Sequence, residues 1–146
     1  MATNKAAERF STFTLLMPAA VNISSGQPLM LGEKYTAAGV AVEAQNTSNP
    51  PYDNNTGYLT VDLEGAYFLS VVGETLGSLS SGAAIKTGDP VFASGGTYDP
   101  TSGITYGFVL CADVAGDLFG IALAPVAAGA TVIIPVLLKN AVTKAT

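Results

Sequence analysis

Two carboxylates on one short segment are the residues best placed for catalysis. Asp62 and Glu64 stand two positions apart at the end of the alternating segment 58–63. Residues two apart in a strand share a face, and paired carboxylates supply the acid and the nucleophile or base of glycoside hydrolases. The same spacing is typical of the solvent side of a half-buried strand. Because the second interpretation needs only ordinary sheet chemistry, we expect no enzyme activity.

The remaining side chains leave few other reactions open. The chain has no histidine and one cysteine, Cys111, which excludes Ser-His-Asp and Cys-His sites and a four-ligand zinc site. Cys111 stands in the apolar run 108–112, so we expect a buried small hydrophobe. Residues Asp53 to Gly57 resemble the start of a calcium loop but lack the closing glutamate of an EF-hand, and turn chemistry explains them equally well. We expect no cofactor and no metal, with a weak calcium site there as the open alternative.

Composition points to a surface that is partly covered by another protein. Charged residues make up 12% of the chain, against about 25% in typical domains, while apolar residues make up 49%. Self-association is the simplest way to bury such an apolar surface. Residues 14–138 include two basic and ten acidic residues, which gives this part of the chain a net charge of −8. Such a charge would repel nucleic acid. The apolar run 132–138 is too short to span a membrane, and the N-terminus lacks a secretion signal, so we expect synthesis in a cytoplasm.

The elements that must position these residues are short strands. We expect them at residues 10–17, 29–31, 35–44, 58–63, 66–72, 90–94, 104–112, 119–124 and 131–138. The Gly- and Ser-rich segment 74–84 holds at most one helical turn. About ten closely spaced strands predict an all-β fold, a small antiparallel β-barrel or sandwich with long loops and little helix. Residues 1–13 form an N-terminal arm, 14–140 a single β-rich domain and 141–146 a C-terminal tail.

A pattern that occurs twice is the strongest organising signal. Ile23-Ser-Ser-Gly-Gln-Pro-Leu-Met is echoed by Ile85-Lys-Thr-Gly-Asp-Pro-Val-Phe, and Gly39-Val-Ala-Val is echoed by Gly120-Ile-Ala-Leu. Each pair predicts a Gly-x-Pro turn that starts a strand, followed by a second strand that opens with glycine. Repeated turn-and-strand units in a chain with so few catalytic side chains favour a scaffold over a catalyst.

Tyrosines lie in or beside the two longest loops, residues 45–57 and 95–103. They are Tyr52, Tyr58, Tyr98 and Tyr106. A tyrosine in such a loop can stack on a partner while its hydroxyl stays in water, or it can anchor the loop on its own sheet. We name Tyr52, Tyr58 and Tyr98 as candidate partner contacts and leave both interpretations open.

The repeated motifs resemble the capsid decoration, or cement, proteins of tailed bacteriophages. The resemblance spans residues 18–138 and is carried by four short motifs: Gly88-Asp89-Pro90-Val91, Gly39-Val40-Ala41, Gly120-Ile121-Ala122-Leu123 and Ala128-Gly129-Ala130 before the last apolar strand. The first turn departs from the family pattern, because Gln27 stands where aspartate is usual.

This resemblance implies a non-enzymatic virion protein, made in a bacterial host, on the outer surface of a matured head. Such proteins tie neighbouring major capsid protein subunits together against the pressure of the packaged DNA. They commonly sit as trimers, and in some phages as dimers. We expect the N-terminal arm to add capsid contacts through two basic and two aromatic residues: Lys5, Arg9, Phe10 and Phe13. The alternatives are another β-barrel virion component, such as a tail or head-fibre module, and the glycoside hydrolase considered above.

Overall fold

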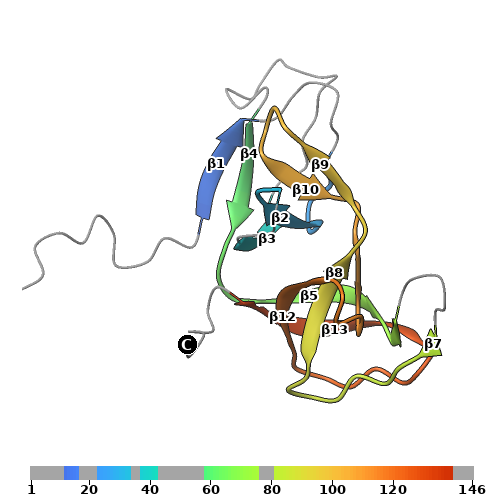
Figure 1. The fold of residues 1–146 in the computed structure, drawn as a ribbon. Coiled ribbons are helices and arrows are strands. Elements are labelled where there is room, and N and C mark those ends of the chain that lie inside the picture. The colour runs from blue at the N-terminus through green and yellow to red at the C-terminus, as the bar shows by residue number, and fades with distance from the viewer. Residues whose placement is uncertain (1–11, 17–22, 34–36, 43–57, 76–80, 140–146) are drawn as a thin grey trace, which may run out of the picture.

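Strands make up nearly all of the regular structure (Figure 1). The computed structural model describes residues 12–16, 23–33, 37–42, 58–75 and 81–139. The strands in these residues are β1 (Thr12–Leu16), β2 (Pro28–Leu31), β3 (Ala37–Ala41), β4 (Tyr58–Asp62), β5 (Ala66–Val72), β6 (Glu74–Thr75), β7 (Ser81–Gly82), β8 (Pro90–Ser94), β9 (Thr97–Asp99), β10 (Ile104–Tyr106), β11 (Val109–Cys111), β12 (Asp117–Ala122) and β13 (Thr131–Leu138). The prediction of an all-β fold is confirmed.

The strands form two main sheets, of which one closes into a barrel. The first is an open six-stranded sheet in the order β1-β4-β3-β2-β10-β9, and the second is a closed barrel in the order β11-β5-β13-β12-β8. The open sheet occupies the upper half of Figure 1 and the barrel the lower half. The antiparallel arrangement holds for each pair except β11 and β5, which run parallel where the barrel closes. Short strands β6 and β7 pair in segment 74–84, where the sequence allows a helical turn.

The two turns predicted from the repeated pattern are built in the same way. Gly26 donates its amide hydrogen to the carbonyl oxygen of Ala41 (2.8 Å), and Ala41 donates to the carbonyl oxygen of Gln27 (3.0 Å). In the second copy Gly88 donates to Ala122 (2.7 Å), and Ala122 donates to the carbonyl oxygen of Asp89 (2.9 Å). Both glycines have positive φ, 80° and 93°, a conformation that other residues rarely adopt. The prolines that follow them open β2 and β8 as predicted.

The correspondence extends beyond the turns to two sets of four strands. The first repeat comprises β1, β4, β3 and β2, and the second repeat comprises β5, β13, β12 and β8, adjacent in that order in both sheets. Val61 pairs with Phe13 and Ala41 in the first repeat, and Val136 pairs with Tyr67 and Ala122 in the second. A fifth strand flanks each repeat, because β10 pairs with β2 and β11 pairs with β8. The internal repeat in the sequence is therefore a repeat in the fold.

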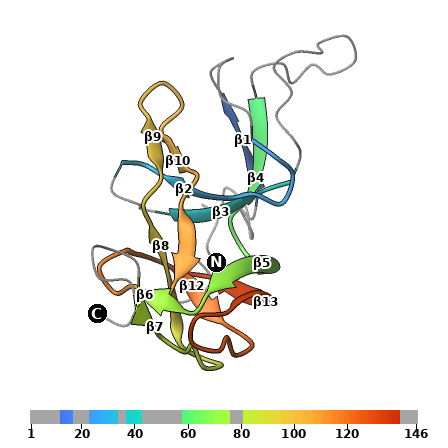
Figure 2. The ribbon, with the colours of Figure 1, turned by 90° about the vertical axis from the view of Figure 1, so that its right-hand side faces the viewer.

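One long hairpin joins the two sheets (Figure 2). β9 and β10 form its half in the open sheet, and β8 and β11 form its half in the barrel. The sequence predicts one strand over 104–112, but Gly107, with φ of 73°, interrupts it. Gly96 lies on the opposite arm with φ of 98°. These glycines let both arms bend, and the register is the same on either side, with Tyr106 opposite Thr97 and Val109 opposite Ser94.

Each sheet encloses its own apolar cluster. The larger cluster fills the barrel around Phe108 and Phe119, whose ring centroids lie 5.8 Å apart. It also takes in Met30, Ala38 and Val40, so one side of the open sheet is buried against the barrel. The smaller cluster covers the other side of that sheet: Ile23, Leu29, Ala41, Val61 and Ile104. Burying a large apolar side chain contributes about 1.5–3 kcal/mol, so the larger cluster, which is shared by both sheets, holds them as one unit.

Candidate functional site

The predicted carboxylate pair does not share a strand face. Asp62 is the last residue of β4, whereas Glu64 lies beyond the strand in the bend that leads to β5. Asp62 accepts a hydrogen bond from the phenol of Tyr67, and the same phenol oxygen lies 3.3 Å from the backbone carbonyl oxygen of Glu64. The spacing rule fails here because the strand ends at the first carboxylate. The Asp62 carboxylate is tied to the junction between the two repeats.

The chemistry of this junction is that of a structural hydrogen bond. Partial burial, the hydrogen bond to Asp62 and the negative charge of Asp62 together raise the pKa of Tyr67 to about 12. A phenol with that pKa stays protonated at neutral pH and acts as a donor. The bond joins the last strand of the first repeat to β5, the first strand of the second.

A second group of hydrogen bonds closes the hairpin tip at residues 99–103. The Asp99 carboxylate accepts hydrogen bonds from the hydroxyl of Ser102 (2.6 Å) and from the amides of Ser102 (3.2 Å) and Thr101 (3.3 Å). The hydroxyl hydrogen bond is the largest cause that holds the pKa of Asp99 below its usual value. This arrangement is a turn stabilised by its own side chains.

The other candidates for chemistry are Cys111 and the proposed calcium segment. Cys111 is fully buried in β11, as predicted. The proposed calcium segment, residues 53–57, lies outside the described residues. Within the described parts of the chain, no group of three or more Asp, Glu, Cys or His side chains could hold a metal ion.

The residues named as partner contacts are dispersed. Lys5, Arg9, Phe10 and Tyr52 lie outside the described residues. Phe13 is in β1, opposite Val61, and Tyr58 opens β4, opposite Leu16. Tyr98 is half-buried in β9. Tyr106 packs against the smaller apolar cluster, which favours anchoring over a free aromatic surface at this position.

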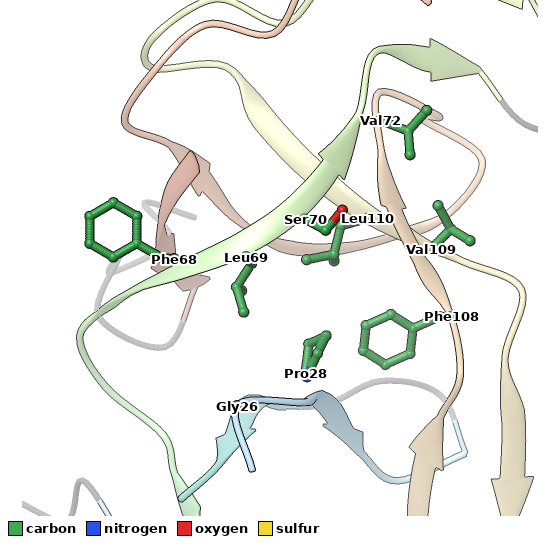
Figure 3. A pocket seen from close by; sticks show the side chains of 9 residues that line it. All are labelled: Gly26, Pro28, Phe68, Leu69, Ser70, Val72, Phe108, Val109 and Leu110. Atoms are coloured by element: carbon green, nitrogen blue, oxygen red, sulfur yellow. The ribbon is translucent and has the colours of Figure 1, made fainter. Parts of the chain in front are cut away.

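A cavity of about 450 Å³ lies where the open sheet meets the barrel (Figure 3). Pro28 approaches it from the turn that starts β2, Leu69 from β5, and Phe108 from the segment before β11. None of the residues that line it is titratable. Binding sites for small molecules combine apolar walls with a few polar groups that fix orientation. This cavity has apolar walls, and Ser70 is the polar side chain among its lining residues. Its chemistry therefore suits an apolar group.

The outer side of the barrel carries a group of apolar residues, which we call the outer barrel face. They occupy outward-facing positions on β5 and β13 and the position after β12: Ala66, Phe68, Leu123, Ile133, Pro135 and Leu137. The exposed Ser70 is their polar neighbour. Phe68 lies opposite Pro135, whose carbonyl oxygen accepts the amide hydrogen of Leu123 (2.9 Å). None of these residues is charged. Exposed apolar patches on soluble proteins commonly mark interaction sites.

Sequence reasoning located the strands of this face but missed the face itself. The signal was present, because β13 has apolar residues at both inward and outward positions of its alternation. A strand in contact with water on one side usually alternates apolar with polar residues. The apolar outward set of β13 is therefore the departure from that pattern that marks this face.

Comparison with known proteins gives no match, whether to family models, to curated proteins or to solved structures. Among the described residues, no helix has the length and apolar character needed to cross a membrane.

Proposed function

We propose that the chain is a structural virion protein that binds the outer surface of the expanded head of a tailed bacteriophage. It ties neighbouring major capsid protein subunits together against the pressure of the packaged DNA. The observation that carries the proposal is the turn at Gly88–Pro90, which belongs to one of the four motifs of the resemblance and whose backbone hydrogen bonds recur in the turn at Gly26–Pro28. The low charge and the uncharged outer barrel face add support, since both suit a protein covered by others.

The mechanism is thermodynamic. A protein that binds the expanded lattice and not the immature one stabilises the expanded form by mass action. Several linked copies on one head multiply the effect without any new contact. No bond is made or broken, so the function needs no catalytic residue and no cofactor.

The capsid contacts belong to the N-terminal arm in this proposal. Lys5 and Arg9 give the arm positive charge in a chain of net charge −5, and Phe10 and Phe13 give it apolar anchors. Tyr52, Tyr58 and Tyr98 are further contacts to a partner. The partners are the major capsid protein and other copies of the chain, as a trimer or a dimer, with no role for nucleic acid or membrane.

Cosedimentation with empty heads of the virus that encodes the chain tests the proposal. We expect saturable binding to expanded heads and none to immature heads. Deletion of residues 2–9 should weaken this binding strongly, whereas Lys86→Ala, which removes one exposed positive charge from the turn before β8, should leave it unchanged. Failure to bind expanded heads would overturn the proposal, and full binding without residues 2–9 would overturn the role of the arm.

A further inference from the structure

One edge of β5 is open along most of its length. β11 pairs with β5 at Val71 and Val72 alone. Within the described residues, the rest of that edge, residues 66–70, has no strand beside it. β5 also carries no charged residue and no proline, with which proteins commonly protect an exposed strand edge. This edge can therefore accept a further strand.

The main-chain groups of Phe68 face the open edge. Phe68 lies opposite Pro135, which has no amide hydrogen and whose carbonyl oxygen accepts the amide hydrogen of Leu123 on the far side of β13. The alternation of an antiparallel ladder then turns the amide and the carbonyl of Phe68 away from β13. Gly65, three residues earlier, accepts the amide hydrogen of Leu138 (3.0 Å), as that alternation requires. Phe68 thus offers a donor and an acceptor to an added strand.

The cavity between the open sheet and the barrel lies beside this edge (Figure 3). Leu69 points into it from β5, and Pro28 and Phe108 form other parts of its wall. Two of its lining residues, Phe68 and Val109, are 77% and 40% exposed, so the cavity opens to solvent where β5 and β11 separate. Side chains alternate between the two faces of a strand, so an added strand would place the side chain opposite Leu69 on the cavity side.

Charge at both ends of this edge favours a basic segment. Glu74 follows β5, and Asp113 lies beside it, because the residue before Asp113 donates its amide hydrogen to the Glu74 carbonyl oxygen (3.1 Å). At the start of β5, the carboxylates of Asp62 and Glu64 outnumber the nearby Lys139. Basic residues at either end of an added strand would meet opposite charge.

We propose that the open edge of β5 and the adjoining cavity bind an extended peptide segment of a partner protein. The segment adds a strand to the barrel through main-chain hydrogen bonds to Phe68, places a large apolar side chain in the cavity, and carries basic residues on either side of it. The inference goes beyond the proposed head-binding role, in which the N-terminal arm makes the contacts.

Backbone NMR of the purified chain tests the proposal, with the capped peptide Lys-Thr-Val-Phe-Val-Thr-Lys as the probe. We expect saturable binding that slows hydrogen exchange of the Phe68 amide. N-methylation of the two valines removes the amides that would pair with β5 and should weaken binding about tenfold. Replacement of the peptide phenylalanine by serine should weaken it by a similar factor, and replacement of both lysines by glutamate by a smaller one.

Two variants of the chain locate the site. Phe68→Pro removes the amide at the open edge, and Phe68→Ala is the matched control because it loses the same ring and keeps the amide. We expect Phe68→Pro to lose binding and Phe68→Ala to retain it. If Phe68→Pro loses the circular dichroism of the folded chain, the N-methylated peptide tests the same hydrogen bonds on the unaltered chain.

Absence of saturable binding would overturn the proposal. Equal binding of the N-methylated peptide would do so as well, because the cavity would then take an apolar group without strand addition. Tighter binding of a peptide of residues 2–11 would make the chain's own arm the occupant and would contradict a separate partner. None of these results depends on heads, so the peptide site and the head-binding role can fail independently.

Discussion

The two repeats share strand order, register and turn geometry, yet one is open and the other is closed. The second repeat closes because β5 continues to Val72, so that Val71 and Val72 pair in parallel with β11. In the first repeat the fifth strand, β10, pairs with β9 along its second edge, whereas the second edge of β11 pairs with β5. The last two residues of β5 thus close the barrel.

The open repeat packs against the closed one. One side of the open sheet lies on the barrel through Met30, Ala38 and Val40. The open copy and the closed copy can therefore pack together as one protein.

The largest expected effect separates Gly39 and Gly120, the glycines in the second strand of each turn unit. The sequence predicts that each glycine opens its strand, but β3 begins at Ala37 and β12 at Asp117, so both glycines lie inside their strands. A Cβ atom on Gly120 would lie 2.2 Å from the backbone oxygen of Leu137, whereas on Gly39 it would first meet a side-chain methyl group of Val61, at 2.4 Å. A side chain can move and a ladder carbonyl cannot move without breaking pairing. We expect Gly120→Ala to lower the free energy of unfolding by about 3 kcal/mol or more and Gly39→Ala by about 1–2 kcal/mol.

Urea denaturation followed by circular dichroism measures both changes. Gly88→Ala is a useful companion, because nothing lies within 4 Å of its added Cβ atom and the cost there comes from the positive φ alone. If Gly39→Ala proved as costly as Gly120→Ala, the closed repeat would not be the more tightly packed copy.

Much of this architecture follows from residue patterns. β5, β8 and β13 begin and end where alternation and turn residues place them, and Pro28 and Pro90 open strands because proline suits the first position. The paired turns were visible as Ile-x-x-Gly-x-Pro in both halves. These features depend on local chemistry, which a single sequence contains.

Other features depend on contacts between distant segments. The sequence does not indicate that β11 pairs in parallel with β5, because the residues of a strand do not identify the strand it pairs with. The carboxylate pair was misplaced because β4 ends at Asp62, where the chain turns to bring Tyr67 onto that carboxylate. The outer barrel face becomes visible only when β5 and β13 are aligned, since exposure of Phe68 is a property of the assembled sheet.

The next largest effect concerns the bond that joins the repeats. Tyr67→Phe removes the phenol that donates to Asp62, and we expect a loss of about 1.5 kcal/mol at neutral pH. The pKa of Tyr67 is raised from 10.0 to about 12, so this contribution is fully present below pH 10 and is lost as pH rises from 10 to about 12. Urea midpoints measured across that range should fall in the unaltered chain more steeply than in Tyr67→Phe.

Asp62→Asn sharpens this test because it keeps an acceptor at the junction and removes the charge. The decline between pH 10 and about 12 should be smaller in this variant, since the negative charge of Asp62 is one cause of the raised pKa of Tyr67. Equal declines in all three proteins would show that the bond does not couple β4 to β5.

The smallest expected effect comes from removing the side chain that accepts a backbone hydrogen bond within each of the two turns. The Asp89 carboxylate accepts the amide hydrogen of Lys86 at 2.8 Å, and the Gln27 side-chain oxygen accepts that of Ser24 at 3.0 Å. A charged acceptor makes the stronger bond. We expect Asp89→Ala to cost about 1 kcal/mol and Gln27→Ala about 0.5 kcal/mol in thermal or urea unfolding.

The reciprocal change completes the comparison of the turns. Gln27→Asp gives the first turn the acceptor of the second, and because the backbone hydrogen bonds of the two turns are the same, the shorter carboxylate can reach the amide of Ser24 as Asp89 reaches that of Lys86. Gln27→Asp should therefore be neutral or more stable than the unaltered chain by a few tenths of a kcal/mol. Destabilisation by Gln27→Asp would mean that the turns differ in their side-chain surroundings despite their common backbone, and the equivalence of the repeats would then stop at the main chain.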